Sequence, residues 1–167
     1  MLLRPAVPAD LPQIVALERL PESRQYVGQW DEDHHARALA GHDARYFVHE
    51  DEYGQIQAYI LLLGFEEGPL SIEFKRFVVA QTGRGLGRRL LAEILRLVFE
   101  EIGVHRFYLD VVEDNVRARH LYKTLGFIEE GVMREATQRG GEWLSLVLMS
   151  LLDHEYRERV RSARSPE

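Results

Sequence analysis

The chain contains no cysteine, and no apolar run in it approaches the ~20 residues that a membrane-spanning helix needs. The lack of cysteine excludes a disulfide framework and thiol catalysis, and it fits a reducing compartment. The first residues, Met1-Leu2-Leu3-Arg4-Pro5, do not form the apolar segment of a signal peptide. These absences lead us to expect a cytoplasmic protein that has no membrane partner.

Positive charge is also in short supply, since 21 Lys and Arg residues face 27 Asp and Glu residues, for a formal net charge of -6. Nucleic-acid binding depends on basic patches that displace counterions from phosphates, so this balance argues against a nucleic-acid partner. It suits a cationic amine substrate better. With 167 residues, of which 46% are hydrophobic and 29% charged, the chain has the size and composition of one soluble globular domain.

Glycine is concentrated in one stretch, Val78 to Leu91, which has the pattern of a strand, a bare loop and a helix start. Its glycines and arginines are Gly83, Gly85, Gly87, Arg84, Arg88 and Arg89. The glycines permit a tight turn that leaves several main-chain N–H groups open to one anion, and the helix start adds unpaired N–H groups and the positive end of its dipole. The combination predicts a phosphate site. A glycine turn before a solvated basic helix start is the simpler alternative.

Two well-known phosphate motifs do not fit this stretch. A P-loop needs Gly-Lys-Ser or Gly-Lys-Thr after its spacers, and the sequence has no such run. The dinucleotide motif G-x-G-x-x-G needs Gly or Ala where this chain has Arg88 in one register and Leu90 in the other.

The loop does resemble the acyl-CoA-binding motif of the GNAT superfamily of N-acetyltransferases, Gln/Arg-x-x-Gly-x-Gly/Ala, although Thr82 stands where Gln or Arg is expected. The stretch from Asn115 to Phe127 resembles the second signature of that family, which is Asn-x-x-Ala, then Leu-Tyr, then Leu-Gly-Phe. Both signatures occur in the family's order, each after an apolar strand pattern. Glu129-Glu130-Gly131, Arg134 and the stretch 148–152 resemble the branch of ribosomal-protein N-terminal and polyamine acetyltransferases.

The resemblance implies an α+β fold of mixed α/β layout, the GNAT fold. This is a central mixed twisted sheet of six to seven strands, flanked by about four helices, with one splayed pair of parallel strands. We expect residues 1–152 to form a single N-acetyltransferase domain and residues 153–167 to form a charged tail, a solvated helix that frays.

Secondary-structure patterns agree with this fold. Strands are predicted at 2–4, 46–48, 55–63, 72–79, 106–112, 127–134 and 143–152. Helices are predicted after an Asp10 cap, from Asp31 to Gly41, from the glycine loop to Gly103, and from an Asn115 cap to Gly126.

The implied activity is transfer of an acetyl group from acetyl-CoA, the co-substrate, to a primary amine by direct attack on the thioester. The acceptor is a small-molecule amine or a peptide or protein N-terminus. The residues assigned to the cofactor are Phe77, Val78, Val79, Thr82, Gly83, Arg84, Gly85, Leu86, Gly87, Arg88 and Asn115. The pantetheine arm is expected along residues 77–79, with the N–H of Val79 or Val78 holding the thioester oxygen.

Two further side chains are assigned to proton transfer. Tyr122 is the expected general acid for the departing sulfur, because a phenol keeps its proton at neutral pH; the alternative is a core aromatic. Glu73 is a candidate general base, acting directly or through water, or else a solvated strand carboxylate. Asn115 serves the cofactor's amide arm, or only as a helix cap.

The segment Leu20 to Trp30 covers the acceptor side in the family, so Tyr26 and Trp30 either shape the substrate pocket or close the core. No metal site is expected, because Asp33, His34 and His35 are adjacent on a helix and point in different directions. The resemblance implies a homodimer as one assembly that the chain could form. The competing functional hypothesis is a CoA-binding sensor or interaction module that kept the fold and lost turnover.

Overall fold

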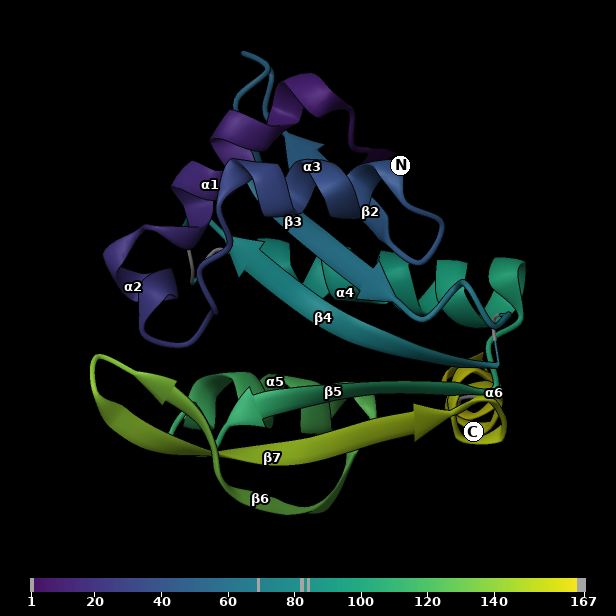
Figure 1. Cartoon of the computed structure of the whole chain (residues 1–167). Helices are drawn as coiled ribbons and strands as arrows, with labels where there is room; N and C mark the ends of the chain where they lie inside the picture. Colours follow the sequence, from purple (N-terminus) through teal and green to yellow (C-terminus); the bar gives the residue numbers. More distant parts are fainter. Residues whose placement is uncertain (1, 69, 82, 84, 165–167) are drawn as a thin grey trace. The chain divides into compact units, whose positions relative to one another are not determined.

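The computed structural model describes residues 2–68, 70–81, 83 and 85–164 (Figure 1). The strands are β1 (Arg4–Pro5), β2 (Arg45–Glu50), β3 (Ile56–Leu63), β4 (Ser71–Val79), β5 (Arg106–Val112), β6 (Ile128–Arg139) and β7 (Glu142–Leu152). The helices are α1 (Leu11–Glu18), α2 (Pro21–Arg24), α3 (Glu32–Ala40), α4 (Leu86–Arg96), α5 (Val116–Leu125) and α6 (Asp153–Arg164). A 3₁₀ turn at Pro8–Asp10 precedes α1, and a π-helical turn at Leu97–Ile102 follows α4. None of the described helices is long and apolar enough to cross a membrane.

The strand order is β1-β2-β3-β4-β5-β7-β6 in a seven-stranded mixed sheet, and β4 and β5 are its parallel pair, which confirms the predicted GNAT fold. Two compact units divide the chain. The first comprises Met1–Gly68 and Glu73–Ile94, and the second comprises Pro69–Ile72 and Leu95–Glu167. Within the second unit the carbonyl of Leu70 accepts the N–H groups of His105 and Arg106, at 3.2 and 3.0 Å, where β5 begins.

In the first unit β1 to β4 are antiparallel neighbours, and α1 and α3 lie on one side of β2 and β3 with α4 on the other (Figure 1). The β2–β3 turn has Gly54 at φ 74°, a conformation that glycine adopts without the steric cost of a Cβ. In the second unit β5, β7 and β6 are antiparallel, and Gly140 and Gly141 join β6 to β7 with positive φ at both residues.

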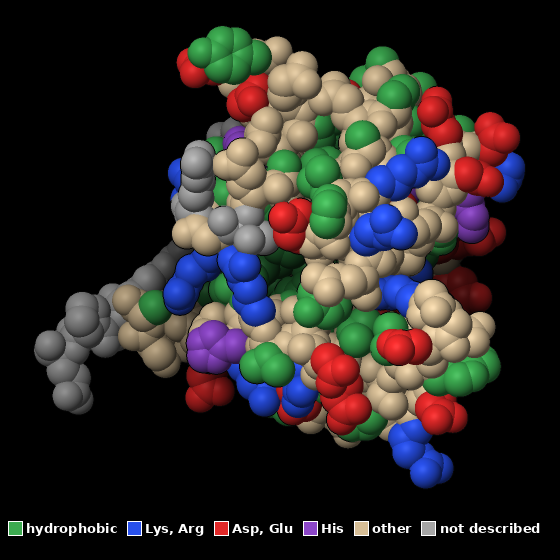
Figure 2. Space-filling view, turned by 90° about the vertical axis from the view of Figure 1, so that its left-hand side faces the viewer, with side chains coloured by type: hydrophobic (Ala, Val, Ile, Leu, Met, Phe, Trp, Pro, Cys, Tyr) green, Lys and Arg blue, Asp and Glu red, His purple; other side chains and the backbone are tan. Residues whose placement is uncertain are grey.

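Acidic and basic side chains lie next to one another over the face drawn in Figure 2. Among the described ion pairs of the chain, the Arg4 guanidinium lies 2.8 Å from the Asp10 carboxylate and 2.6 Å from the Glu50 carboxylate. The surface in view is therefore not a single acidic patch, although the net charge of the chain is -6.

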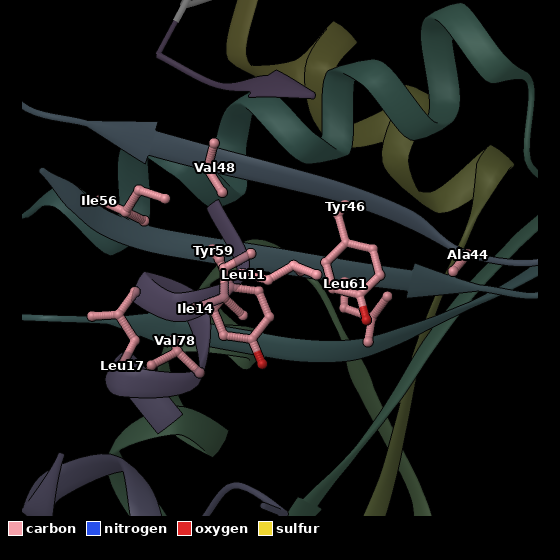
Figure 3. Packing of buried hydrophobic residues seen from close by; sticks show 10 residues of the cluster. All are labelled: Leu11, Ile14, Leu17, Ala44, Tyr46, Val48, Ile56, Tyr59, Leu61 and Val78. Carbon is pink, nitrogen blue, oxygen red and sulfur yellow. The ribbon is translucent and has the colours of Figure 1, made fainter. Parts of the chain in front are cut away.

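The core of the first unit joins one face of α1 to β2 and β3 (Figure 3). It comprises Leu11, Ile14, Leu17, Ala44, Tyr46, Val48, Ile56, Tyr59, Leu61 and Val78. The α1 residues recur at helical spacing, so one stripe is apolar, and each fully buried aliphatic side chain contributes about 1.5–3 kcal/mol. The rings of Tyr46 and Tyr59 are stacked, with centroids 6.5 Å apart. Their hydroxyl groups need hydrogen-bond partners inside the protein.

One sequence prediction about a helix end is wrong. Asp10 does not cap α1: its carboxylate accepts the N–H of Val7 at 2.8 Å and pairs with Arg4, which lowers the pKa of Asp10. The tail beyond residue 152 is helical as predicted, but it is not solvated on every side, because on α6 the ring of Tyr156 stacks on Phe99 at 4.8 Å.

Candidate active site

The glycine loop adopts the backbone conformation that its sequence predicts. Gly83 has φ 93° and Gly85 has φ 75°, values that side-chain-bearing residues rarely adopt. A Cβ at either position would meet no heavy atom within 4 Å, so the space beside the backbone is open. Thr82 and Arg84, two other predicted cofactor residues, lie outside the described residues. The requirement for glycine in this turn is confirmed, while binding of the cofactor stays a prediction.

The start of α4 supplies donors and positive charge next to this turn. The N–H of Arg89 donates to the carbonyl of Gly85 at 3.3 Å, so the helical turn opens at Gly85. The N–H groups of Leu86, Gly87 and Arg88 come too early in the helix to find a carbonyl one turn before them. Arg88 and Arg89 are exposed, and neither makes an ion pair with a described residue. Gly87 lies against the ring of Phe77, 3.6 Å from the position of a Cβ.

The last residues of β4 differ in the direction of their N–H groups. Val78 is opposite Tyr59 and Val79 is opposite Ala58 in the β3–β4 ladder. The N–H of Ala80 donates to the carbonyl of Gln57 at 2.7 Å, on the β3 side. Main-chain groups alternate along a strand, so the N–H of Val78 also points toward β3, and that of Val79 points away from it. The N–H of Val79 therefore faces the side of β4 that is turned away from β3, whereas the side chain of Val78 belongs to the core.

Glu73 lies on β4 opposite Leu63, and its side chain is about half-buried. Its carboxylate pairs with the Lys75 ammonium at 3.0 Å. The β3–β4 register shifts at this point, since Leu61 is opposite Arg76 and Leu62 is opposite Phe74, so Lys75 is the extra residue of a β-bulge. The bulge re-aims the side chains that follow it. The predicted base thus has a cationic neighbour that the sequence pattern did not reveal.

Tyr122 and Asn115 lie on α5, in the second unit. The Tyr122 ring is half-buried and tilted against Phe127, with centroids 5.7 Å apart. Loss of hydration raises the pKa of the Tyr122 phenol above its ordinary value of 10, so the phenol holds its proton throughout the neutral range, as a general acid must. The side chain of Asn115 accepts the N–H of Ala118 at 3.2 Å, which confirms the helix cap.

Trp30 and Tyr26 occupy the segment between α1 and α3, and both are half-buried. Trp30 packs against the core of the first unit, its ring stacked on His34 at 3.8 Å and lying 4.9 Å from the Arg76 guanidinium carbon. Both faces of the indole are therefore occupied. A substrate cation could meet only the edge of this ring, which leaves Trp30 as a wall and not as a cation–π platform.

Comparison with known proteins places these elements in one family. The model of the acetyltransferase (GNAT) family matches residues 11–127, which include the glycine loop and Tyr122. The chain belongs to the GNAT family of acetyltransferases.

Relatives within this family act on amines. A spermidine N(1)-acetyltransferase of Vibrio cholerae is 30% identical over 116 residues, or 69% of this chain and 67% of that protein. An L-amino acid N-acyltransferase of Escherichia coli, MnaT, is 35% identical over 71 residues, 41% of this chain and 40% of that protein. The crystal structure of the Vibrio cholerae spermidine N-acetyltransferase in complex with CoA and spermine matches with a TM-score of 0.82 at 26% identity, and it covers 93% of this chain and 96% of that one.

A further structure, the Vibrio cholerae spermidine/spermine N-acetyltransferase SpeG with manganese ions, matches with a TM-score of 0.79 at 26% identity and covers 94% of this chain and 95% of that one. In the described part of this GNAT chain, His, Cys, Asp and Glu form no group of three or more that could hold a metal ion. Of the neighbouring pair on α3, His34 is exposed and His35 is buried, yet both rings contact Trp30, with ring centroids 3.8 and 5.3 Å from that of the indole.

The GNAT chain also contains a buried polar network that the sequence patterns missed. Glu18, the last residue of α1, is 1% exposed. One of its carboxylate oxygens accepts the hydroxyl of Tyr59 and the Arg76 Nε at 3.2 Å. The other accepts the main-chain N–H of Trp30 at 3.1 Å and lies 3.4 Å from the Nε2 of His35. The sequence offered one signal of this network, which is that Glu18 comes four residues after Ile14 and so places a carboxylate on the apolar stripe of α1.

Donors outweigh desolvation around this carboxylate. Burial opposes ionisation of Glu18, but the ring of His35, the Tyr59 hydroxyl, the Trp30 N–H and the charge of Arg76 together hold the pKa of Glu18 below its ordinary value. Burial and the Glu18 charge raise the pKa of Tyr59 well above 10, so its proton stays in the bond. The ion pair with Arg76 is thus permanent near neutral pH.

Proposed function

We propose that this chain transfers the acetyl group of acetyl-CoA to a primary amine of a polyamine such as spermidine. The observation that carries the proposal is the likeness, over nine-tenths of both chains, to a spermidine N-acetyltransferase whose structure holds CoA and spermine. The 30% identity to a spermidine N(1)-acetyltransferase supports the same acceptor class. A net charge of -6 also favours a polycationic acceptor.

The glycine turn and the start of α4 hold the pyrophosphate in this proposal. Gly83 and Gly85 are in the backbone conformation that exposes main-chain N–H groups, and Arg88 and Arg89 add two exposed guanidinium groups without ion-pair partners among the described residues. Acetyl-CoA is the acyl donor, and the outward N–H of Val79 stabilises the oxyanion that forms on the carbonyl oxygen of the thioester when the amine attacks its carbon.

Proton transfers fall to two side chains. The acceptor enters as an ammonium ion, and Glu73 takes its proton directly or through water, so that the free amine can attack the thioester carbon. The carbon–sulfur bond then breaks as Tyr122 donates its phenolic proton to the departing sulfur. The second proton, which the nitrogen loses as it becomes an amide, returns to the Tyr122 phenolate through water. Asn115, whose carbonyl oxygen caps α5, keeps its side-chain N–H groups for the cofactor's amide arm. In this proposal residues 1–152 act as a single catalytic domain.

Free thiol release tests the proposal. Purified protein, acetyl-CoA and a thiol reagent are combined with spermidine, spermine, simple monoamines, amino acids and a peptide. Thiol release that depends on the amine and is fastest with polyamines supports the proposal. Release of thiol with peptides only, or binding of acetyl-CoA with no release across the panel, contradicts it; the second result supports a sensor.

Tyr122→Phe then separates chemistry from binding. It should lower kcat about a hundredfold or more, because the departing thiolate loses its acid, and leave acetyl-CoA affinity nearly unchanged. Tyr53→Phe is the matched control, because Tyr53 is 80% exposed on the β2–β3 hairpin. Equal activity in both variants would remove Tyr122 from the mechanism.

A further inference from the structure

The C-terminal end of one segment is bound to Glu18 by two hydrogen bonds. The side-chain amide of Gln29 donates to the main-chain carbonyl of Glu18 at 2.6 Å, and the N–H of Trp30 donates to its carboxylate at 3.1 Å. Because Leu20 follows Glu18 closely in the chain, the segment from Leu20 to Trp30 leaves α1 and returns to the same residue. Glu18, which is 1% exposed, therefore closes this segment into a loop.

Arg76 is held in place by three different contacts. Its Nε donates to Glu18 at 3.2 Å, its guanidinium carbon lies 4.9 Å from the centre of the Trp30 ring, and its side chain is 10% exposed. The third contact is with the loop itself, since a Cβ on Gly28 would lie 2.9 Å from the Nη2 of Arg76. Gly28 thus lets the loop backbone pack directly on the guanidinium.

Charge balance is the consequence of this arrangement. Arg76 is a permanent cation behind the loop that carries Tyr26 and Trp30. The second basic partner, His35, shares a hydrogen bond with the Tyr46 hydroxyl at Nδ1, 3.0 Å away, and its Nε2 lies 3.4 Å from the Glu18 carboxylate. The pair of Glu18 and Arg76 is therefore neutral as a whole, whereas Arg76 alone would add a positive charge that little water screens.

We propose that Glu18 is a positioning residue for the acceptor amine, which fixes the Leu20–Trp30 loop and cancels the charge of Arg76 so that a polycation can bind beside it. The inference rests on the proposed function, because it assigns this loop to the acceptor side. It explains why a carboxylate is buried in the apolar stripe of α1, where an aliphatic residue would pack more cheaply.

The test uses opposite charge changes in one buried pair. Glu18→Gln leaves the positive charge of Arg76 without its counter-charge and should raise the KM for spermidine about tenfold. The KM for a monoamine should rise less, and the KM for acetyl-CoA should not change. Added salt should shrink the difference. Arg76→Gln removes the cation instead and leaves the Glu18 anion unbalanced, so the KM for spermidine should fall below the wild-type value. The double variant E18Q/R76Q should return close to the wild-type KM.

Glu22→Gln is the matched control, because Glu22 is exposed on α2 and makes no ion pair with a described residue. It removes one negative charge four residues after Glu18, from an exposed position, and should leave every KM within about twofold of the wild-type value. Should Glu18→Gln fail to fold, R76Q and E18Q/R76Q carry the same comparison: removing the carboxylate in the R76Q background should raise the KM for spermidine.

A merely structural role of Glu18 predicts a different pattern. Then Glu18→Gln and Arg76→Gln would both raise the KM for spermidine, for the monoamine and for acetyl-CoA, and the double variant would not return to the wild-type KM. That pattern overturns the inference. An unchanged KM for spermidine in Glu18→Gln overturns it as well. If the wild type transfers acetyl to no amine, the proposed function fails and this inference with it. Wild-type transfer to spermidine with an unchanged KM in Glu18→Gln overturns only the role of Glu18.

Discussion

Single side chains in this protein owe their chemistry to how far they are removed from water. Burial raises the pKa of the Tyr122 phenol, whereas donors around Glu18 hold the pKa of that carboxyl down despite burial. Tyr122 is therefore kept as an acid and Glu18 as an anion. Desolvation acts to raise both pKa values, and at Glu18 the hydrogen-bond donors and the Arg76 cation outweigh it.

The pH dependence of turnover should reflect the Tyr122 phenol. Since its pKa is raised above 10, the acid form is lost only at still higher pH, and kcat at saturating substrates should not fall through ionisation of Tyr122 up to about pH 10. The measurement is kcat between about pH 6 and 10. An alkaline decline with a midpoint below 10 that disappears in Tyr122→Phe would contradict the raised pKa of Tyr122.

Gly85 provides a ligand-linked test of the loop. Gly85→Ala should cost about 1–2 kcal/mol, because φ 75° is strained for any residue with a Cβ. Gly85→Glu should in addition abolish the gain in thermal stability from acetyl-CoA, which amounts to about 2.7 kcal/mol at a ligand concentration one hundred times Kd. Gly54→Ala, at φ 74° and equally open, controls for strain and should keep the gain.

Helices and strands in the second unit are held by a few side chains that bridge distant parts of the sequence. On α6, Arg159 donates to the carbonyl of Thr124 at 2.9 Å, near the C-terminal end of α5, the helix that carries Tyr122. On β6, Glu130 pairs with Arg106 of β5 at 2.5 and 2.9 Å and accepts the hydroxyl of Ser150 of β7. The bond of Arg159 holds the C-terminal end of α5, and the bonds of Glu130 connect β5, β6 and β7.

Gly126→Ala should destabilise the protein more than Gly103→Ala. Both glycines end helices with positive φ, 104° and 79°, so backbone strain should lower the free energy of unfolding of both variants by about 1–2 kcal/mol. A Cβ at Gly126 would also lie 2.7 Å from the Cδ of Arg159, whereas a Cβ at Gly103 meets nothing within 4 Å. Urea denaturation measures the difference. It should vanish when Arg159 is changed to Ala in both backgrounds, and a persistent difference would contradict the contact.

Glu130 should make stability depend on pH in a defined window. Its hydrogen bonds with Arg106 and Ser150 lower its pKa from 4.5 to about 2 in the folded protein. A depressed pKa stabilises the fold above the unfolded value, so this contribution is present above about pH 4.5 and is lost as pH falls toward 2. The urea midpoint of the wild type should therefore fall toward that of Glu130→Gln between pH 5 and 2, whereas Glu142→Gln, on an exposed residue, should follow the wild type.

At the scale of the whole molecule, the excess of acidic residues acts on the encounter with substrate. A net charge of -6 attracts a polycation over a distance that salt shortens to about 8 Å at physiological ionic strength. The attraction grows with the charge of the amine. A polyamine should therefore gain more from this field than a monoamine does.

The KM for spermidine should accordingly increase with ionic strength, and the KM for a monoamine should increase less. Steady-state thiol release at about 20 and about 300 mM sodium chloride measures both values, a range over which screening becomes severe. Equal responses of the two amines would indicate that overall charge does not contribute to acceptor choice.

Sequence patterns determined the local features of this protein. Helix and strand periodicity placed β4, β5 and α5 within one residue of their ends, and glycine marked the turns at Gly83, Gly85 and Gly126, because these features depend on neighbours along the chain. Two ordered signatures were enough for the family. The acceptor segment had no such pattern, and only α2 and the contacts of Trp30 give it structure.

Only the tertiary structure decided which charged residues meet next to the segment from Leu20 to Trp30. Glu18 and Arg76 are 58 residues apart, and His35 lies on a third element, so no spacing rule links them. Whether a carboxylate on a helix is solvated or buried depends on which donors the fold brings to it, and these came from β3, β4 and the end of the loop. The same holds for Asp10, which has the sequence position of a helix cap but binds Arg4 and Val7, because a folded neighbour supplied a stronger partner than the helix terminus.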